Sequence, residues 1–202
     1  MFSKNIKFKN FINKKNLKIN KIIKNLIIDK SLLEKYQLLN SLTKEFQYSY
    51  QKKKIKELQR YSEVNLIGMG GSILGAEAIY NFLKHKIKKK ISFYNNIQFQ
   101  GVPKSSKKKI NLVISKSGNT LETVSNLNLV LEKQKKNKNI FLCEKKNNFL
   151  SELAKKLKAE IFEHKNYIGG RYSVLSETGM LPAELMGLNE KKFKRFNYLI
   201  KN

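Results

Sequence analysis

From residue 64 onward, short apolar runs alternate with longer segments that carry apolar residues at helical spacing. The runs predict five strands, and they cover 64–69, 91–94, 111–115, 139–143 and 160–163. Short apolar runs bounded by turn residues are typical of strands buried on both faces. The intervening segments predict helices over 72–88, 120–135 and 150–157, with Ser72 capping the first. A last helix, containing Pro182 and Ala183, is expected after the fifth strand.

The first 60 residues lack glycine and proline, and they predict helices joined by polar turns. The first dozen are expected to be loosely ordered. Further along, apolar side chains recur at helical spacing and predict one apolar stripe. Its members are Leu32, Leu33, Tyr36, Leu39, Leu42 and Phe46.

Strands that alternate with helices of this length predict right-handed βαβ crossovers. We therefore expect an α/β fold: a three-layer αβα sandwich with a mostly parallel, five-stranded, Rossmann-like sheet, preceded by a helical N-terminal extension. The expected division is a helical extension over 1–60, the sheet domain over 61–190 and a basic tail over 191–202. A chain of 202 residues is long enough for one such domain plus an extension.

The formal net charge of +27 raises the question of nucleic-acid binding. Lysine is spread over almost every segment together with abundant Asn and Ile, as an AT-rich genome would encode. No helix-turn-helix or RNA-binding motif is present. We interpret the charge as a solvated surface that attracts anionic metabolites, and we expect no nucleic-acid partner.

Cys143 is the only cysteine, so no disulfide can form within the chain, and a buried position in a strand is expected for it. This fits a reducing compartment, and the cytoplasm is the expected location. No apolar run approaches the ~20 residues of a membrane span. His85 and His164 have no neighbouring ligand pattern, so neither a metal nor another cofactor is expected.

The first of three polar loops, Gly-Met-Gly-Gly-Ser over 68–72, follows a predicted strand. Ile73 stands where a dinucleotide fingerprint needs its third glycine, and no P-loop lysine follows. What remains is a tight turn that lets a ligand approach the backbone, with Ser72 adding a hydroxyl. A strand-to-helix turn without a ligand is the alternative.

The second loop, Ser-Lys-Ser-Gly-Asn-Thr over 115–120, begins at the end of the third predicted strand. Its hydroxyls and N–H groups surround the start of a helix, which favours a phosphate dianion. Lys116 would contribute to phosphate binding either through its charge or only through its backbone N–H. The alternative is a plain helix cap made by Asn119 or Thr120.

The third loop, Gly-Gly-Arg-Tyr-Ser over 169–173, is followed by Ser176 and Gly179. It resembles a signature of the glucose-6-phosphate isomerase family, and the second loop resembles the phosphate loop of sugar isomerase (SIS) domains. With Gly-Met-Gly-Gly-Ser-Ile-Leu-Gly, all three landmarks occur in the family order between residues 64 and 188.

The resemblance implies an isomerase of glycolysis and gluconeogenesis that interconverts glucose 6-phosphate and fructose 6-phosphate without a cofactor. It implies that Gly71 and Ser72 line the sugar and that Glu122 orients a histidine. The alternative for Glu122 is an exposed glutamate that interacts favourably with the helix dipole. Arg171 would stabilise the enediolate oxygen, unless it pairs with Glu177. The phosphate is assigned to Ser115, Lys116, Ser117 and Thr120.

The family's base is a glutamate well downstream of the third loop, and neither Glu177 nor Glu184 matches its position. We therefore expect a fragment that binds hexose 6-phosphate but is nearly inactive, from a family that forms homodimers. A standalone sugar-phosphate-binding module is the alternative. A missing partner domain would leave apolar surface exposed. The candidates for that surface are Leu181, Leu185 and Met186.

Overall fold

The computed structural model describes residues 35–43, 45–97, 109–134 and 136–196. Leu32, Leu33 and the expected loose order of the first dozen residues lie outside these ranges. Over the described ranges, no helix combines the length and apolar character needed to cross a bilayer.

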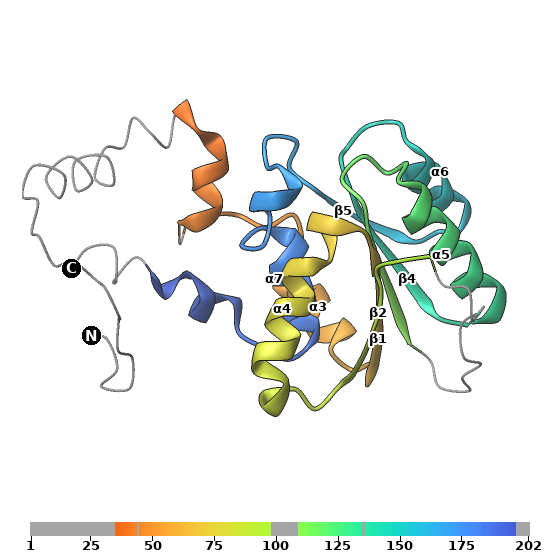
Figure 1. Cartoon of the computed structure of the whole chain (residues 1–202), viewed down its shortest axis with the longest axis horizontal. Coiled ribbons are helices and arrows are strands. Elements are labelled where there is room, and N and C mark those ends of the chain that lie inside the picture. Colours follow the sequence, from red (N-terminus) through yellow and green to blue (C-terminus); the bar gives the residue numbers. More distant parts are fainter. Residues whose placement is uncertain (1–34, 44, 98–108, 135, 197–202) are drawn as a thin grey trace, which may run out of the picture.

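Five parallel strands form one sheet in the order β2-β1-β3-β4-β5 (Figure 1). They are β1 (Glu63–Gly68), β2 (Lys90–Tyr94), β3 (Ile110–Ile114), β4 (Lys138–Cys143) and β5 (Glu160–Glu163). All five predicted strands are confirmed to within one residue. The central strands β1 and β3 are buried along their whole length, as their continuous apolar runs predict.

Helices cover both faces of the sheet (Figure 1). On one face lie α5 (Leu121–Lys133) and α6 (Phe149–Lys156), and on the other lie α3 (Lys52–Leu58), α4 (Leu74–Leu83) and α7 (Glu177–Leu185). Side chains alternate between the two faces, so Leu66 joins the core beneath α4 and α7 while Ile67 joins the core beneath α5 and α6. The α/β three-layer sandwich is confirmed.

The expected helix over 72–88 is shorter and begins differently. A 3-10 turn, η2 (Gly70–Ser72), precedes α4, and a second one, η3 (Lys84–Lys86), follows it. Ser72 belongs to η2, whereas Ile73 occupies the position before α4 and provides no side-chain cap. The predicted cap was therefore wrong. The bounds of α5 and α6 agree with the prediction to within two residues.

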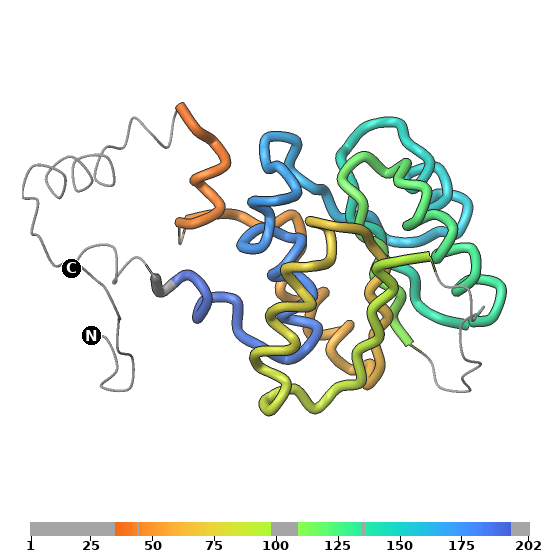
Figure 2. Tube along the Cα trace, in the orientation of Figure 1, coloured from red at the N-terminus to blue at the C-terminus, as the bar shows by residue number. Residues whose placement is uncertain are grey.

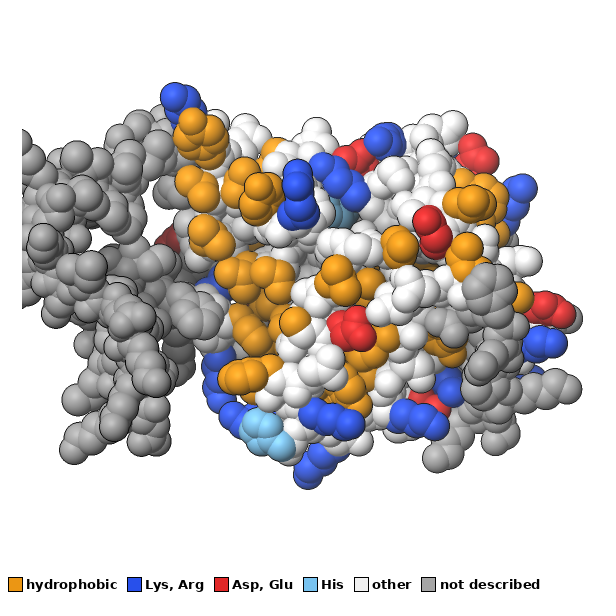
Figure 3. All heavy atoms as spheres, viewed as in Figure 1, with side chains coloured by type: hydrophobic (Ala, Val, Ile, Leu, Met, Phe, Trp, Pro, Cys, Tyr) orange, Lys and Arg blue, Asp and Glu red, His pale blue; other side chains and the backbone are white. Residues whose placement is uncertain are grey.

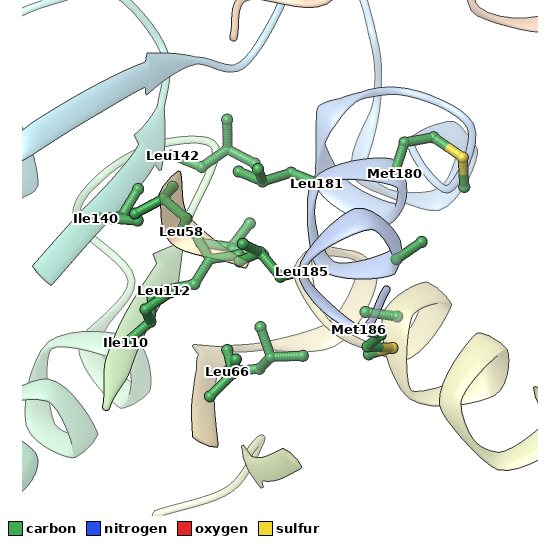
Figure 4. Close-up of a cluster of buried hydrophobic side chains, with 14 of the residues drawn as sticks. Leu58, Leu66, Ile110, Leu112, Ile140, Leu142, Met180, Leu181, Leu185 and Met186 are labelled. Carbon is green, nitrogen blue, oxygen red and sulfur yellow. The ribbon is translucent and has the colours of Figure 1, made fainter. Parts of the chain in front are cut away.

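Figure 4 shows that the three apolar residues expected at an exposed edge lie in the core instead. Leu181 and Leu185 on α7 point toward the sheet residues Leu142 and Leu112, and both are fully buried. Met186, at the end of α7, is 3% exposed. The expectation was wrong because α7 covers the sheet and presents these side chains to the strands.

Exposed apolar side chains occur elsewhere on the described surface. Figure 3 shows hydrophobic side chains gathered on the face that α4 covers. Phe82 on α4 is 82% exposed, and Leu74, Leu121 and Tyr172 are also exposed.

The described part of the N-terminal stripe does not form the buried face of an α-helix. Residues 37–42 form a 3-10 helix, η1 (Gln37–Leu42), and Tyr36 and Leu42 are exposed. A 3-10 helix repeats every three residues, so Leu39 and Leu42 still share one side, but the buried residue of this helix is Ser41 on another side. Phe46 lies outside any helix and contacts Tyr48 edge to face at 5.2 Å.

Residues 45–58 run beside α7 and the last described residues, 190–196 (Figure 2). Ser49 donates from its N–H to Glu177 (2.9 Å) and from its hydroxyl to the Glu163 carbonyl (3.0 Å). Ile55 and Leu58 on α3 lie in the core beneath α4 and α7. The expected boundaries at residues 60 and 190 stay predictions; the last described element is the 3-10 helix η5 (Glu190–Phe196).

A ladder of amide side chains crosses the buried sheet. Asn65 on β1 donates to Asn111 on β3 (2.8 Å), and Asn111 donates to Asn139 on β4 (2.8 Å). Asn65 also donates to Gln134 (2.9 Å), and Asn137 donates to both Asn111 (3.0 Å) and Gln134 (2.7 Å). These three strand residues are register partners, so the amides meet directly across the sheet. The ladder satisfies polar groups that would otherwise be costly to bury.

Candidate functional site

The first and third loops touch each other through their glycines. A Cβ atom placed on Gly71 would lie 2.4 Å from the carbonyl carbon and oxygen of Gly170, which begins the 3-10 turn η4 (Gly170–Tyr172). The buried Ser173 hydroxyl donates to the Gly170 carbonyl (2.7 Å) and lies 3.3 Å from the Gly71 carbonyl. The two loops are thus held together by a backbone contact that only glycine permits.

The second loop gathers three hydroxyl groups at the start of α5. The Ser115 and Thr120 oxygens are 2.8 Å apart, and the Ser117 oxygen lies 3.5 Å from the former and 3.4 Å from the latter. Ser115 follows β3 directly, at the edge of the sheet where helix N-termini point their free N–H groups. Hydroxyls and a positive helix end together suit an oxyanion.

The hydroxyls of this loop do not cap α5. Thr120 occupies the position before the helix but makes no capping hydrogen bond. Asn119 accepts instead from the Phe149 N–H at the start of α6 (2.9 Å). Gly118 has a φ of +71°, and any Cβ there would lie 2.0 Å from the Asn148 side chain. The plain-cap alternative therefore fails, because the loop is shaped by its neighbour α6.

A cavity of about 300 Å³ opens beside Ser117 and Thr120, while Ser115 is buried behind them and does not line it. It is lined by Ser72, Lys116, Ser117, Thr120, Glu144 and Lys146. Ser72 brings the first loop to the cavity that the second loop lines. Sequence reasoning missed Glu144 and Lys146, although they follow β4, and the rule that singled out Ser115 at the end of β3 would have found them.

Glu144 carries the negative charge of this cavity. Lys146 lies 2.5 Å from its carboxylate and Lys116 lies 3.6 Å from it, while Lys116 also donates to the Asn166 carbonyl (2.7 Å). The hydrogen bond from Lys146 holds the pKa of Glu144 below its usual value, against the effect of burial. The carboxylate is therefore ionised at neutral pH, and the three charged groups sum to one positive charge.

Arg171 stands in η4, exposed, and does not line the cavity. It forms no ion pair with any described residue, and Glu177 binds the Ser49 N–H, so the Arg171–Glu177 pair is absent. Glu122 is half-buried in the first turn of α5 and does not line the cavity either. Gly71 lies against Gly170, next to Arg171.

The two histidines lie apart, His164 in the loop after β5 and His85 in η3. His164 is buried, with Nδ1 3.1 Å from the Lys165 carbonyl, and burial lowers the pKa of His164. His85 lies exposed in η3. Within the described ranges, no group of three or more His, Cys, Asp or Glu side chains could hold a metal ion. Cys143 is fully buried on β4 and unpaired, as predicted.

The family model for phosphoglucose isomerase matches residues 29–199. The chain is 35% identical over 153 residues to a glucose-6-phosphate isomerase from Methanocaldococcus jannaschii, covering 69% of this chain and 36% of that protein. It is 32% identical over 140 residues to a glucose-6-phosphate isomerase from Borreliella afzelii, covering 61% of this chain and 26% of that protein. The chain spans about a quarter to just over a third of the length of such relatives.

Solved structures show the same fold at low identity. A hypothetical protein, TT0462, from Thermus thermophilus superposes with a TM-score of 0.62 at 18% identity, covering 88% of this chain and 46% of that one. A tagatose-6-phosphate ketose/aldose isomerase from Escherichia coli superposes with a TM-score of 0.54 at 14% identity, covering 87% of this chain and 47% of that one.

Proposed function

Because the chain belongs to the phosphoglucose isomerase family, we propose that it forms the phosphate- and sugar-binding part of an aldose–ketose isomerase. The reaction is the interconversion of glucose 6-phosphate and fructose 6-phosphate. The curated relatives carry the name glucose-6-phosphate isomerase, which is the source of the substrate in this proposal.

One observation carries the proposal: three hydroxyls of one loop converge at the N-terminus of α5, beside a cavity. Ser115, Ser117 and Thr120 lie within 3.5 Å of one another in pairs. A phosphate dianion is stabilised by several donors and by the positive end of a helix. In this proposal the three hydroxyls hold the phosphate, and Lys116 adds positive charge beside them.

The other sugar contacts follow from the way the first and third loops meet. Ser72 lines the cavity, so its hydroxyl and the Gly71 backbone would face the sugar chain. Arg171 has no competing acid among the described residues, which leaves its guanidinium free to stabilise a negative enediolate oxygen. Glu122 would orient a histidine from a part of the family's site that this chain does not match.

Glu177 and Glu184 are poor candidates for the base that moves the proton. Glu177 is buried and accepts from the Ser49 N–H, while Glu184 pairs with Lys52. We therefore propose that these 202 residues bind hexose 6-phosphates with little or no turnover. Cytoplasmic location and homodimer assembly stay predictions.

The test has two parts. Isothermal titration calorimetry measures binding of glucose 6-phosphate and of fructose 6-phosphate to the purified chain, and a coupled isomerase assay measures turnover. Binding without appreciable turnover is expected. Rapid turnover would contradict the absence of a base from these residues. No binding of either sugar phosphate would contradict the proposed function itself.

A further inference from the structure

A carboxylate lines the cavity that the proposed function assigns to phosphate. Glu144 is ionised, and its side chain is only 13% exposed. Carboxylates repel phosphate dianions, so a pocket built for phosphate alone would place none here. Its presence calls for a part of the ligand that a carboxylate favours.

The backbone of Glu144 is anchored on both sides. Its N–H donates to the Lys116 carbonyl (3.0 Å), and its own carbonyl accepts from Lys146 (2.8 Å) and from the side chain of Asn148 (3.2 Å). Asn148 in turn caps α6 through a capping box with Ser151. The backbone of Glu144 is therefore fixed by the fold, and its carboxylate is held beside the ammonium groups of Lys146 and Lys116.

The cavity has room for more than a phosphate. At about 300 Å³ it lies at the lower end of the range typical of small-molecule pockets. The hydroxyl cluster occupies one part of the lining, and the Glu144–Lys146 pair occupies another. A carboxylate accepts two or more hydrogen bonds and an ammonium group donates up to three, which suits adjacent hydroxyl groups.

We propose that Glu144 is a specificity-determining residue that accepts hydrogen bonds from the ligand hydroxyls nearest the phosphoester, with Lys146 held beside it as a donor. This inference rests on the proposed function, because it takes the phosphate to lie on the second loop. Glu144 opposes binding of a phosphate without hydroxyls and favours one that carries them. Lys116 keeps its place through the Asn166 carbonyl whether or not Glu144 is charged.

The test compares two phosphomonoesters that differ only in their hydroxyls, glycerol 3-phosphate and n-propyl phosphate. Dissociation constants are measured by NMR titration of the full chain at pH 8, where both ligands are dianions. The unmodified chain is expected to bind glycerol 3-phosphate about three- to tenfold more tightly. In Glu144→Gln and Glu144→Ala, propyl phosphate should bind more tightly than before, and the preference should fall toward one, more completely for the alanine variant.

Glu132→Gln provides the matched control. This residue is exposed in the last turn of α5, so the variant makes the same change in net charge at the far end of the helix. It should leave the preference between the two ligands unchanged. Circular dichroism of each variant establishes that the fold is retained.

Two results overturn the inference while leaving the proposed function in place. One is an unmodified chain that binds hexose 6-phosphates but shows no preference for glycerol 3-phosphate. The other is a Glu144 variant in which both ligands gain affinity by the same factor, as charge alone would produce. A chain that binds no phosphomonoester overturns both this inference and the proposed function.

Discussion

Gly71 and Gly170 meet backbone to backbone, with no room for a Cβ atom between them: one placed on Gly71 would lie 2.4 Å from the Gly170 carbonyl group. This contact joins the loop after β1 to the loop that carries Arg171. Gly71→Ala should therefore force the two loops apart and lower the free energy of unfolding by about 1–3 kcal/mol. Urea denaturation measures the change.

Gly169→Ala is the control for this prediction. A Cβ atom at Gly169 would meet only the Tyr172 ring, at 3.5 Å, and its φ of −69° suits any residue. This variant should be near neutral. Equal losses for both variants would mean that the close approach at Gly71 is not what the loops depend on.

A second prediction concerns the hydroxyl cluster. Thr120→Val keeps the shape of the side chain but removes the hydroxyl 2.8 Å from Ser115. If the cluster holds a phosphate, losing one donor to a charged ligand should weaken binding of glucose 6-phosphate about tenfold or more. Isothermal titration calorimetry at constant ionic strength measures the affinity.

Thr123→Val makes the same chemical change one turn along α5. The Thr123 hydroxyl is buried and has no hydrogen-bond partner, and it does not line the cavity. Its removal should leave affinity unchanged and keep or raise stability, because an unsatisfied buried hydroxyl is costly. A loss of affinity in this variant would indicate that α5 itself had shifted.

The third prediction is a pH dependence at Glu184. Lys52 bridges the carboxylates of Glu184 and Glu190, and burial raises the pKa of Glu184 to about 7. Unfolding would release this proton nearer pH 4.5, so Glu184 lowers the stability of the fold progressively as the pH rises from about 4.5 to 7. The side chain in Glu184→Gln cannot lose a proton. The free energy of unfolding of this variant, relative to that of the unmodified chain, should therefore rise by up to about 3 kcal/mol between pH 5 and pH 8.

Chemical denaturation of both proteins at several pH values gives that difference directly. Taking the difference cancels groups that do not contact Glu184, including His164, whose lowered pKa acts in the opposite direction. A difference that does not change with pH would show that Glu184 titrates as an ordinary carboxylate.

The fourth prediction concerns Lys194 in η5. Its ammonium lies 4.6 Å from the centre of the Phe46 ring and 4.7 Å from that of Tyr48, without a hydrogen-bond partner. Burial lowers the pKa of Lys194 to about 8, so keeping it charged at pH 7 costs stability. Lys194→Met should stabilise the fold by about 1–2 kcal/mol at pH 7, after the lost ring contacts are deducted.

This gain should shrink as the pH rises from 8 toward 10, because Lys194 then becomes neutral in the folded state while staying charged in the unfolded state. Thermal denaturation at pH 7 and pH 9.5 compares the two conditions. Lys192→Met, at an exposed position in the same 3-10 helix, should change stability little at either pH.

The strands were predictable because buried parallel strands leave a local signal, a continuous apolar run. The three-layer arrangement follows from their alternation with helices. By contrast, the burial of Leu181 and Leu185 depends on how α7 packs across the sheet, which no local pattern encodes. The exposure of Tyr36 and Leu42 could not be predicted for a related reason, since apolar spacing does not show which side of a helix packs against the core.

The candidate site was predictable where loops follow strands. Ser72, Lys116, Ser117 and Thr120 share one cavity. Glu144 was missed because a charged residue after a strand is common, although it follows β4 as Ser115 follows β3; its approach to Lys116 appears only in the folded chain. The Gly71–Gly170 contact joins residues that are far apart in sequence, so spacing could not reveal it.

The amide ladder across β1, β3 and β4 has a consequence at the opposite end of the sheet. Each strand rises about 3.3 Å per residue, so a slip of one residue would lower the loop after one strand by that distance relative to the loop after its neighbour. It would also turn an asparagine to the other face of the sheet and leave its partner's amide buried without a hydrogen bond. Asn65, Asn111 and Asn139 thus set the height at which Ser72, Ser115 and Glu144 stand, although they make no contact with the cavity.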